Sequence, residues 1–420
     1  METLTREVAR SIIEFVGSSG TPPEYGFQFF TAGLDEYLDP IEAEYLSSFV
    51  KDGGSSFKMV VGSYGGGKTH FLFCVRERAW KHNFAVSYVR LTPTETPFHK
   101  LESVYQSIVT NLTYPLTGEE LLSGYERGIE SFIKAWYAQV LNQFRRRGVT
   151  GDRLEEELNT YISSMPNCDS ISFTNAVKEA FRCLLDRRDS DFSRIAQWLK
   201  AEGFDRRADG HLRFGILQRI DKGTAFPMIR SLVRWVREVG YSGLVVLFDE
   251  AEVVPSMSGK QKDLLLSNLR ELIDECGHGT LDHSMFFYAV PDENFLQGRT
   301  QIYEALRQRV STVFETINPV GVKIYLEKLS SKPEEVLREI GSKLAEIFEI
   351  AYQIKFETGV LMQSIGNIAD AAYAERFGDI GYKRLFVQAV IKGFQVLRND
   401  PTAIISLEKA KELLHGHGDR

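Results

Sequence analysis

One run of residues has the composition of a phosphate-binding loop. It follows the pattern G-x-x-x-x-G-K-[ST] and consists of Gly62, Ser63, Tyr64, Gly65, Gly66, Gly67, Lys68 and Thr69. Glycines let the backbone curl so that consecutive N–H groups point at phosphate oxygens, and a helix that begins beside Lys68 adds the positive end of its dipole. Lys68 is expected to reach the β- and γ-phosphates, and the Thr69 hydroxyl to ligate Mg²⁺. The pattern therefore predicts a site for ATP and Mg²⁺.

An acidic pair, Asp249-Glu250, follows an apolar run much later in the chain. The run 243–248 is continuously apolar, as expected of a central parallel strand. Asp249 would then lie at the carboxyl edge of the sheet, where a metal ion would bind. Glu250 is the natural group to polarise an attacking water molecule. The pair predicts Asp249 as a metal ligand and Glu250 as the catalytic base of ATP hydrolysis.

Three arginines are further candidates. Arg309, with Arg307 as second choice, would stabilise charge in the phosphoryl-transfer transition state, in cis or from a neighbouring subunit. A solvated helix face explains both arginines equally well. Arg384 opens a C-terminal helix in a Gly-x-x-Arg pattern and would reach the γ-phosphate from a lid. Spacing alone favours that role for Arg384 only weakly.

Hydrophobic periodicity predicts the elements that must position these residues. A short strand at 57–61 runs into the glycine loop, helical spacing follows at 70–81, and a second strand is expected at 84–91. Another strand is expected at 284–290. The order strand, phosphate loop, helix, strand predicts an α/β fold, in which a parallel sheet is flanked by crossover helices.

The chain divides into three predicted parts. Residues 1–56 form an N-terminal helical segment, 57–316 a P-loop ATPase core, and 317–420 a helical lid and C-terminal domain. The phosphate loop and the acidic pair lie about 180 residues apart, whereas most connections in compact domains are short. A helical insertion at about 115–215 is therefore expected inside the core.

Composition sets limits on the classes of function. The chain has 420 residues, 43% of them hydrophobic, and no apolar run long enough to span a bilayer, so a cytoplasmic protein without membrane contact is expected. A net charge of −7 argues against a protein that coats nucleic acid indiscriminately. Basic clusters at 145–147, 187–188 and 206–207 lie among acidic residues. They are interpreted as solvated helix faces, with contact to a phosphate backbone as the alternative.

Several motifs in order resemble those of the BrxC/BrxD ATP-binding family of bacteriophage-exclusion (BREX) and related defence islands. The resemblance covers most of the chain, strongest over 25–110 and 225–310. Its motifs are Gly53-Gly54-Ser55-Ser56-Phe57, the glycine loop continued by His70-Phe71-Leu72, Thr96-Pro97-Phe98-His99-Lys100-Leu101-Glu102, and Gly240-Tyr241-Ser242-Gly243-Leu244 leading to Asp249-Glu250.

The resemblance implies an AAA+-like ATPase near the origin-recognition branch, with a helical lid and a C-terminal part that resembles a winged helix. It carries over Lys68, Thr69, Asp249 and Glu250 as site residues. It also implies roles for Arg309 and Arg384, and His70 is counted with the nucleotide-binding residues as the continuation of the loop motif. The resemblance also implies action on DNA, single- or double-stranded, together with a protein partner such as a helicase. An arginine supplied in trans would require a homo-oligomer.

One segment departs from the pattern of such relatives. A small hydroxyl residue tends to follow the sensing strand there, whereas this chain reads Ala289-Val290-Pro291-Asp292. Asp292 and Asn294 are the remaining candidates for sensing the γ-phosphate, and capping of a helix is an equally good explanation for them.

The prediction is an ATP hydrolase that couples ATP binding and hydrolysis to conformational change in a DNA-associated assembly, in anti-phage defence. The first alternative is a nucleotide-gated switch or helicase loader that hydrolyses slowly and recruits a protein partner. The second is a helicase, because Asp249-Glu250-Ala251-Glu252 is similar to the acidic box of helicases, although no second motor core is found. A small-molecule kinase fits the loop but not the large insertion and helical C-terminus.

Overall fold

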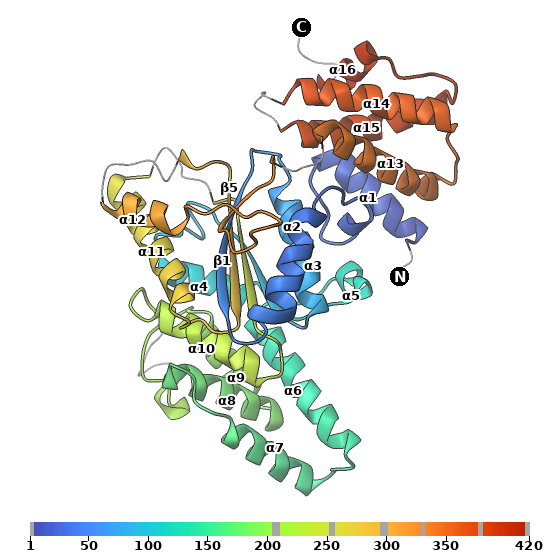
Figure 1. Cartoon of the computed structure of the whole chain (residues 1–420). Coiled ribbons are helices and arrows are strands. Elements are labelled where there is room, and N and C mark those ends of the chain that lie inside the picture. Colours follow the sequence, from blue (N-terminus) through green and yellow to red (C-terminus); the bar gives the residue numbers. More distant parts are fainter. Residues whose placement is uncertain are drawn as a thin grey trace.

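A six-stranded sheet lies at the centre of the computed structural model, which describes residues 4–203, 211–251, 257–294, 301–328, 332–376 and 381–415 (Figure 1). The strand order is β3-β2-β4-β5-β1-β6, and every neighbouring pair is parallel except β2 and β3. The strands are β1 (Ser55–Val61), β2 (Ala85–Arg90), β3 (Leu112–Thr113), β4 (Leu244–Asp249), β5 (Ser284–Val290) and β6 (Lys323–Tyr325). The predicted α/β fold with a parallel sheet is confirmed.

Helices cover both faces of the sheet, and the middle strands are apolar on both sides for that reason. Successive residues of β4 alternate between two hydrophobic clusters, with Val246 in one and Leu247 in the other. One face packs on α4 (Leu101–Thr110), α10 (Ala225–Glu238), α11 (Gly259–Gly277) and α12 (Gln301–Arg309). The other packs on α3 (Lys68–Lys81), α2 (Asp35–Pro40) and the π-helix η2 (Ile41–Phe49). Figure 1 shows α3 and α11 on opposite sides of the strands.

A group of helices between β3 and β4 occupies the stretch where an insertion is predicted. These helices are α5 (Gly118–Ser123), α6 (Ile129–Arg146), α7 (Asp152–Ser164), α8 (Ile171–Leu185), α9 (Asp189–Leu199) and the 3₁₀ turn η3 (His211–Phe214). Thr113 pairs with Val86, near the start of β2, so the group leaves the sheet at the amino ends of the strands. Helices α6–α9 lie at the lower end of Figure 1. The phosphate loop follows the carboxyl end of β1 and therefore lies at the opposite end of the sheet.

The two ends of the chain pack together. Helix α1 (Arg6–Ser19) contacts α13 (Pro333–Tyr352) and α15 (Tyr382–Asn399), and α14 (Thr358–Ala374) and α16 (Leu407–His415) complete this bundle (Figure 1). Within the described parts of 332–415 no strand occurs, so nothing of a winged-helix hairpin is present there. Across the described chain, no helix has both the length and the apolarity needed to cross a bilayer.

Two strands differ from the sequence prediction, which finds no convincing strand from about 101 to 237 and expects helix from about 317. β3 has two residues and β6 has three, too few for a periodic pattern to identify. β6 pairs with β1 through Ile324 and Val60, so the sheet extends past the predicted core boundary at 316. The three-part division of the chain remains a prediction.

A buried lysine holds the segment that leads into β6. Lys58, on β1, is almost fully buried and donates hydrogen bonds of 2.8 Å each to the Tyr45 hydroxyl and to the carbonyl oxygens of Pro319 and Gly321. Burial lowers the pKa of Lys58 to about 7, while its three acceptors favour the charged form. Lys58 thus links η2, β1 and the chain before β6.

Candidate nucleotide-binding site

The phosphate loop connects β1 directly to α3, as its sequence predicts. Gly65 (φ 71°) and Gly67 (φ 99°) adopt left-handed backbone angles that side chains disfavour, which explains the need for glycine at both positions. The Lys68 ammonium donates to the carbonyl oxygens of Gly62 (2.8 Å) and Ser63 (3.0 Å). Its side chain therefore lies along the inner side of the loop, where phosphate oxygens would bind.

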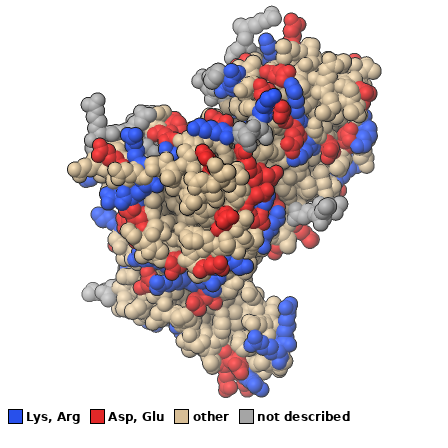
Figure 2. All heavy atoms as spheres, viewed as in Figure 1, with Lys and Arg blue, Asp and Glu red and all other residues tan. Residues whose placement is uncertain are grey.

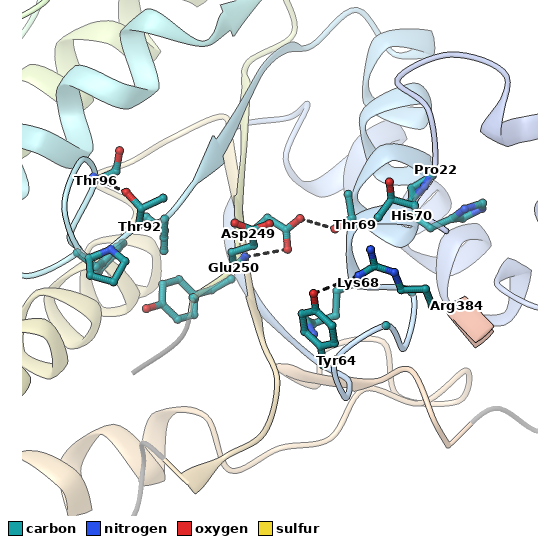
Figure 3. A pocket seen from close by; sticks show the side chains of 18 of the residues that line it. Pro22, Tyr64, Lys68, Thr69, His70, Thr92, Thr96, Asp249, Glu250 and Arg384 are labelled. Atoms are coloured by element: carbon teal, nitrogen blue, oxygen red, sulfur yellow. Dashed lines mark hydrogen bonds between the residues drawn. The ribbon is translucent and has the colours of Figure 1, made fainter. Parts of the chain in front are cut away.

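Asp249 is fully buried at the end of β4, and three donors surround its carboxylate, of which Thr69 and Glu250 are drawn in Figure 3. Oδ2 accepts hydrogen bonds from Thr69 Oγ1 (2.6 Å) and from the Tyr88 hydroxyl (2.7 Å), and Oδ1 accepts one from the Glu250 N–H (2.9 Å). Burial, and then the charge of Asp249, raise the pKa of Tyr88, so this hydroxyl stays protonated and donates. The structure thus brings Thr69 and Asp249, which lie 180 positions apart in sequence, into direct contact.

Glu250 has a strained backbone. Its φ of 56° is in the left-handed region, which non-glycine residues rarely adopt and which is often found at functional sites. Its carboxylate lies 3.6 Å from the guanidinium of Arg90 at the end of β2, and both side chains are more than half exposed. Sequence reasoning missed both Arg90 and Tyr88. The available signal was their position, two residues apart at the end of a strand expected to join the same parallel sheet.

Oxygen donors in this arrangement fit Mg²⁺. The cation prefers carboxylate and hydroxyl oxygens and is bound in nucleotide sites through one or two such groups together with phosphates. Thr69 Oγ1 and the Asp249 carboxylate provide that donor set at the carboxyl edge of the sheet. The three groups that donate hydrogen bonds to Asp249 are all neutral.

A cavity of about 510 Å³ extends over the loop and the acidic pair. Figure 3 shows Lys68, Thr69 and Arg384 on one side of Asp249 and Glu250, with Thr92 and Thr96 on the other. A smaller cavity of about 100 Å³ adjoins the first and shares Gly20–Pro22 and the glycine loop. Apolar side chains from both ends of the chain line it, namely Val16, Phe30, Ala32, Leu34, Val336, Ile340 and Val387.

The start of α15 closes over the phosphate loop. Gly381 approaches the loop so closely that a Cβ atom there would lie 2.0 Å from the Tyr64 carbonyl oxygen. Arg384 Nη1 donates to the Tyr64 hydroxyl (3.1 Å), and its Nε donates to the Ser19 carbonyl (3.0 Å). Arg384 therefore lines the cavity from the C-terminal bundle, and its contact with a γ-phosphate stays a prediction.

Two charged residues that the sequence analysis did not select also contact the loop. Lys383 donates to the Gly66 carbonyl (3.2 Å), and burial lowers its pKa. The Glu327 carboxylate accepts the N–H of Ser63 (3.0 Å). Lys383 occupies an unspecified position of the Gly-x-x-Arg pattern and Glu327 lies outside the motifs named above, so only the folded chain identifies their contacts.

His70 lines the cavities with its ring turned toward the N-terminal segment. Its Nε2 lies 2.7 Å from the Thr31 hydroxyl, and the ring packs against Phe27 and Phe30. Burial, together with the charge of Lys383, lowers the pKa of His70 to about 4, so the imidazole is neutral. His70 forms part of the wall, whereas its neighbours Lys68 and Thr69 face the phosphate position.

Arg309 lies elsewhere. It ends α12 and forms two hydrogen bonds with the carboxylate of Asp274 on α11, and the described residues that line the main cavity do not include it. A role in trans for Arg309 stays a prediction, as does the alternative role of the exposed Arg307. Asp292 accepts the backbone N–H of Asn294 (2.6 Å), and residues 295–300, which would form the helix that the pair caps, lie outside the described residues.

The segment that lines both cavities is anchored to the helical insertion. Glu24 follows Gly20–Pro22, and its carboxylate accepts hydrogen bonds from Tyr125 (2.8 Å) and Arg127 (3.3 Å), just before α6. Its carbonyl oxygen accepts from Arg76 of α3. The cavity wall, the helix after the phosphate loop and the start of the insertion thus meet at one residue.

A parallel sheet whose first strand enters a glycine-rich loop and helix, with an acidic pair at the end of a neighbouring strand, defines a P-loop nucleotide-binding protein. A family model described as "BREX system ATP-binding protein BrxC/D" matches residues 4–410. The chain therefore belongs to the BrxC/D family of BREX ATP-binding proteins, which confirms the resemblance found in the sequence. Comparison with curated proteins and with solved structures returned no match.

Proposed function

We propose that the protein is a Mg²⁺-dependent ATP hydrolase that couples ATP binding and hydrolysis to conformational change in a DNA-associated anti-phage assembly. The observation that carries this proposal is the contact of 2.6 Å between Thr69 and Asp249, made within one cavity beside Lys68 and Glu250. A hydroxyl, a carboxylate, an ammonium and a second carboxylate are the groups that phosphoryl transfer to water requires.

Each group has a role that follows from its position. Thr69 and Asp249 would hold Mg²⁺, which when bound neutralises charge on the phosphate oxygens. Lys68, already aligned along the loop, would exchange part of its carbonyl contacts for β- and γ-phosphate oxygens. The N–H groups of the loop would donate to the same phosphates. Loop and lysine thus orient the nucleotide before any chemistry takes place.

Glu250 is the proposed base. It directly follows the proposed metal-binding aspartate, its carboxylate is accessible, and it lines the main cavity, whereas the described lining of the smaller, apolar cavity does not include it. A carboxylate within reach of a water molecule next to the γ-phosphate would accept the proton that the water loses during attack.

The smaller cavity suits the purine base. Its wall is mainly apolar and formed by α1, the 30–34 segment, α13 and α15. A planar aromatic base would bury apolar surface there, which is the usual main contribution in small-ligand sites. Because the wall comes from both ends of the chain, a bound base would join the C-terminal bundle to the phosphate loop.

The start of α15 is the proposed moving part. Gly381, Lys383 and Arg384 all touch the loop, so a γ-phosphate at the loop would change what these residues contact. Loss of that phosphate on hydrolysis would reverse the change, as in other switches that are ordered by a γ-phosphate.

DNA is the proposed macromolecular partner, and the charges limit where it would bind. On the face shown in Figure 2, lysine and arginine lie among aspartate and glutamate rather than in one continuous surface. Arg188 is neutralised by Glu179 and Asp191, and the cluster 206–207 lies outside the described residues. The exposed cluster 145–147 at the end of α6 remains as the candidate contact with a phosphate backbone.

ATP binding and steady-state hydrolysis should be measured for the wild type, Lys68→Ala and Glu250→Gln, each alone and with single- or double-stranded DNA. Lys68→Ala should lose nucleotide binding. Glu250→Gln should bind ATP as the wild type does and lose hydrolysis, and chelation of Mg²⁺ should stop wild-type turnover. Turnover of Glu250→Gln at the wild-type rate would refute the assignment of the base.

One observation favours the alternative of a slow switch or loader. The pairing of Glu250 with Arg90 competes with water for the carboxylate that hydrolysis needs. A switch predicts tight ATP binding, low turnover with or without DNA, and stimulation only by a protein partner such as a helicase. Stimulation by DNA alone, lost when 145–147 are changed to alanine, would favour the DNA-coupled ATPase instead.

A further inference from the structure

We propose that Tyr88 is a positioning residue for the metal, whose hydroxyl fixes the Asp249 carboxylate in the orientation that binds Mg²⁺ together with Thr69. The inference rests on the proposed function, because the role of Asp249 and Thr69 as metal ligands is itself proposed.

The geometry around Asp249 supports this role. Its Oδ2 accepts hydrogen bonds from both Tyr88 (2.7 Å) and Thr69 (2.6 Å), and its Oδ1 is held by the Glu250 N–H (2.9 Å). Rotation of the carboxylate about its last bond would break these bonds together. Partners that orient a metal ligand in this way typically contribute 10–100-fold to metal affinity.

Of these three donors, only Tyr88 is neither an expected metal ligand nor part of the chain next to Asp249. Thr69 is expected to be a ligand itself, and the Glu250 N–H belongs to the residue next to Asp249 and moves with it. Tyr88 comes from β2, which pairs with β4 through Tyr88 and Leu247. The centroid of its ring lies 5.1 Å from the ring centroid of Phe73 on α3. Two elements therefore fix its hydroxyl in place.

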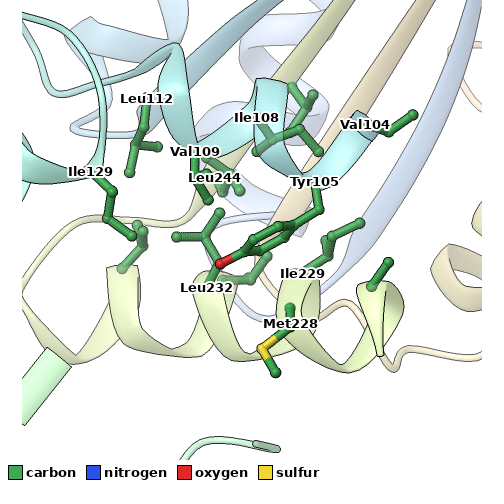
Figure 4. Packing of buried hydrophobic residues seen from close by; sticks show 14 of the residues in the cluster. Val104, Tyr105, Ile108, Val109, Leu112, Ile129, Met228, Ile229, Leu232 and Leu244 are labelled. Atoms are coloured by element: carbon green, nitrogen blue, oxygen red, sulfur yellow. The ribbon is translucent and has the colours of Figure 1, made fainter. Parts of the chain in front are cut away.

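Tyr88→Phe removes only the oxygen atom and keeps the ring that packs on Phe73. The chain also offers a matched control in Tyr105→Phe. Tyr105 is fully buried on α4 among apolar side chains (Figure 4), and its hydroxyl has no hydrogen-bond partner within the part of the chain that the structure describes. The same chemical change there leaves Asp249 untouched.

The test is a titration of a fluorescent ATP analogue against the full-length protein, first with excess EDTA and then at increasing Mg²⁺ concentration. Tyr88→Phe should bind the analogue normally without metal and need about 10–100-fold more Mg²⁺ for the half-maximal response. Hydrolysis should return to near the wild-type rate at saturating Mg²⁺. Tyr105→Phe should match the wild type throughout.

Two results would overturn the inference. One is a wild-type Mg²⁺ midpoint for Tyr88→Phe, and the other is a loss of metal-free binding as large as the loss of Mg²⁺ response, which would indicate a damaged pocket. A wild-type protein that binds the analogue without any response to Mg²⁺ would instead refute the proposed function. The failure of the inference and the failure of the proposed function are thus distinguishable.

Discussion

Replacing Gly381 by alanine tests the contact between α15 and the phosphate loop. The backbone angles of Gly381 (φ −58°, ψ 126°) suit any residue, so the space around it decides the outcome. An added Cβ would lie 2.0 Å from the Tyr64 carbonyl oxygen, whereas real Cβ contacts stay beyond 3.0 Å. The helix start and the loop must therefore separate by about 1 Å, a displacement that can cost about 10²-fold in rate at a positioned site.

The assay is steady-state hydrolysis and binding of ATP by Gly381→Ala, with thermal unfolding as a check on folding. We expect kcat/KM to fall by about 10–100-fold and Tm to fall as well, because alanine is a poorer N-cap than glycine and the added Cβ forces two packed elements apart. Gly366→Ala on α14 is the control, since a Cβ there would approach only Arg338 Nε, at 3.9 Å. Unchanged affinity and turnover in Gly381→Ala would refute the idea that this contact couples the C-terminal bundle to the nucleotide.

Three further substitutions test other contacts. Arg384→Ala removes charged hydrogen bonds at the cavity and should weaken ATP binding about tenfold; unchanged affinity in a binding titration would contradict this. Arg90→Met should raise DNA-free turnover about two- to threefold by releasing Glu250, since an exposed pair is worth under about 1 kcal/mol; a fall in the steady-state rate would count against it. Between pH 7 and 10.5 the unfolded chain holds a proton on Lys58 that the folded chain releases, so wild-type stability should rise with pH by at most about 1.4 kcal/mol per unit. Urea unfolding at pH 7.5 and 9.5 should show a smaller rise in Lys58→Met, and equal rises would show that the three hydrogen-bond acceptors keep Lys58 protonated in the folded chain.

The phosphate loop and the acidic pair were predictable because their signals are local. A loop of glycines ending in Lys68 and Thr69 needs only its own neighbours to be recognised, and Asp249 is identified by the strand before it. The strands β4 and β5 were predictable as well, because their apolar runs are long enough to be recognised as strands. Short strands such as β6 form only because they pair with a strand that is distant in sequence, and hydrophobic periodicity does not predict such pairing.

Residues that act through tertiary contact were missed for the same reason. Tyr88 and Arg90 belong to an ordinary strand pattern, which predicts that β2 joins the parallel sheet but not that it pairs with β4. Lys383 and Glu327 touch the phosphate loop only because the C-terminal bundle and the chain after β6 return to it. Arg309 shows the converse case, since its sequence pattern suggested a catalytic arginine and the structure pairs it with Asp274.

The anchoring of Glu24 has a mechanical consequence. Arg127, which holds its carboxylate, lies two residues before the first residue of α6, and α6 has 18 residues and so extends about 27 Å. A tilt of about 10° at its start would carry the far end, where Arg145 and Arg146 lie, through about 5 Å. A small displacement of the cavity wall would therefore produce a displacement several times larger at the far end of α6, which acts as a lever arm.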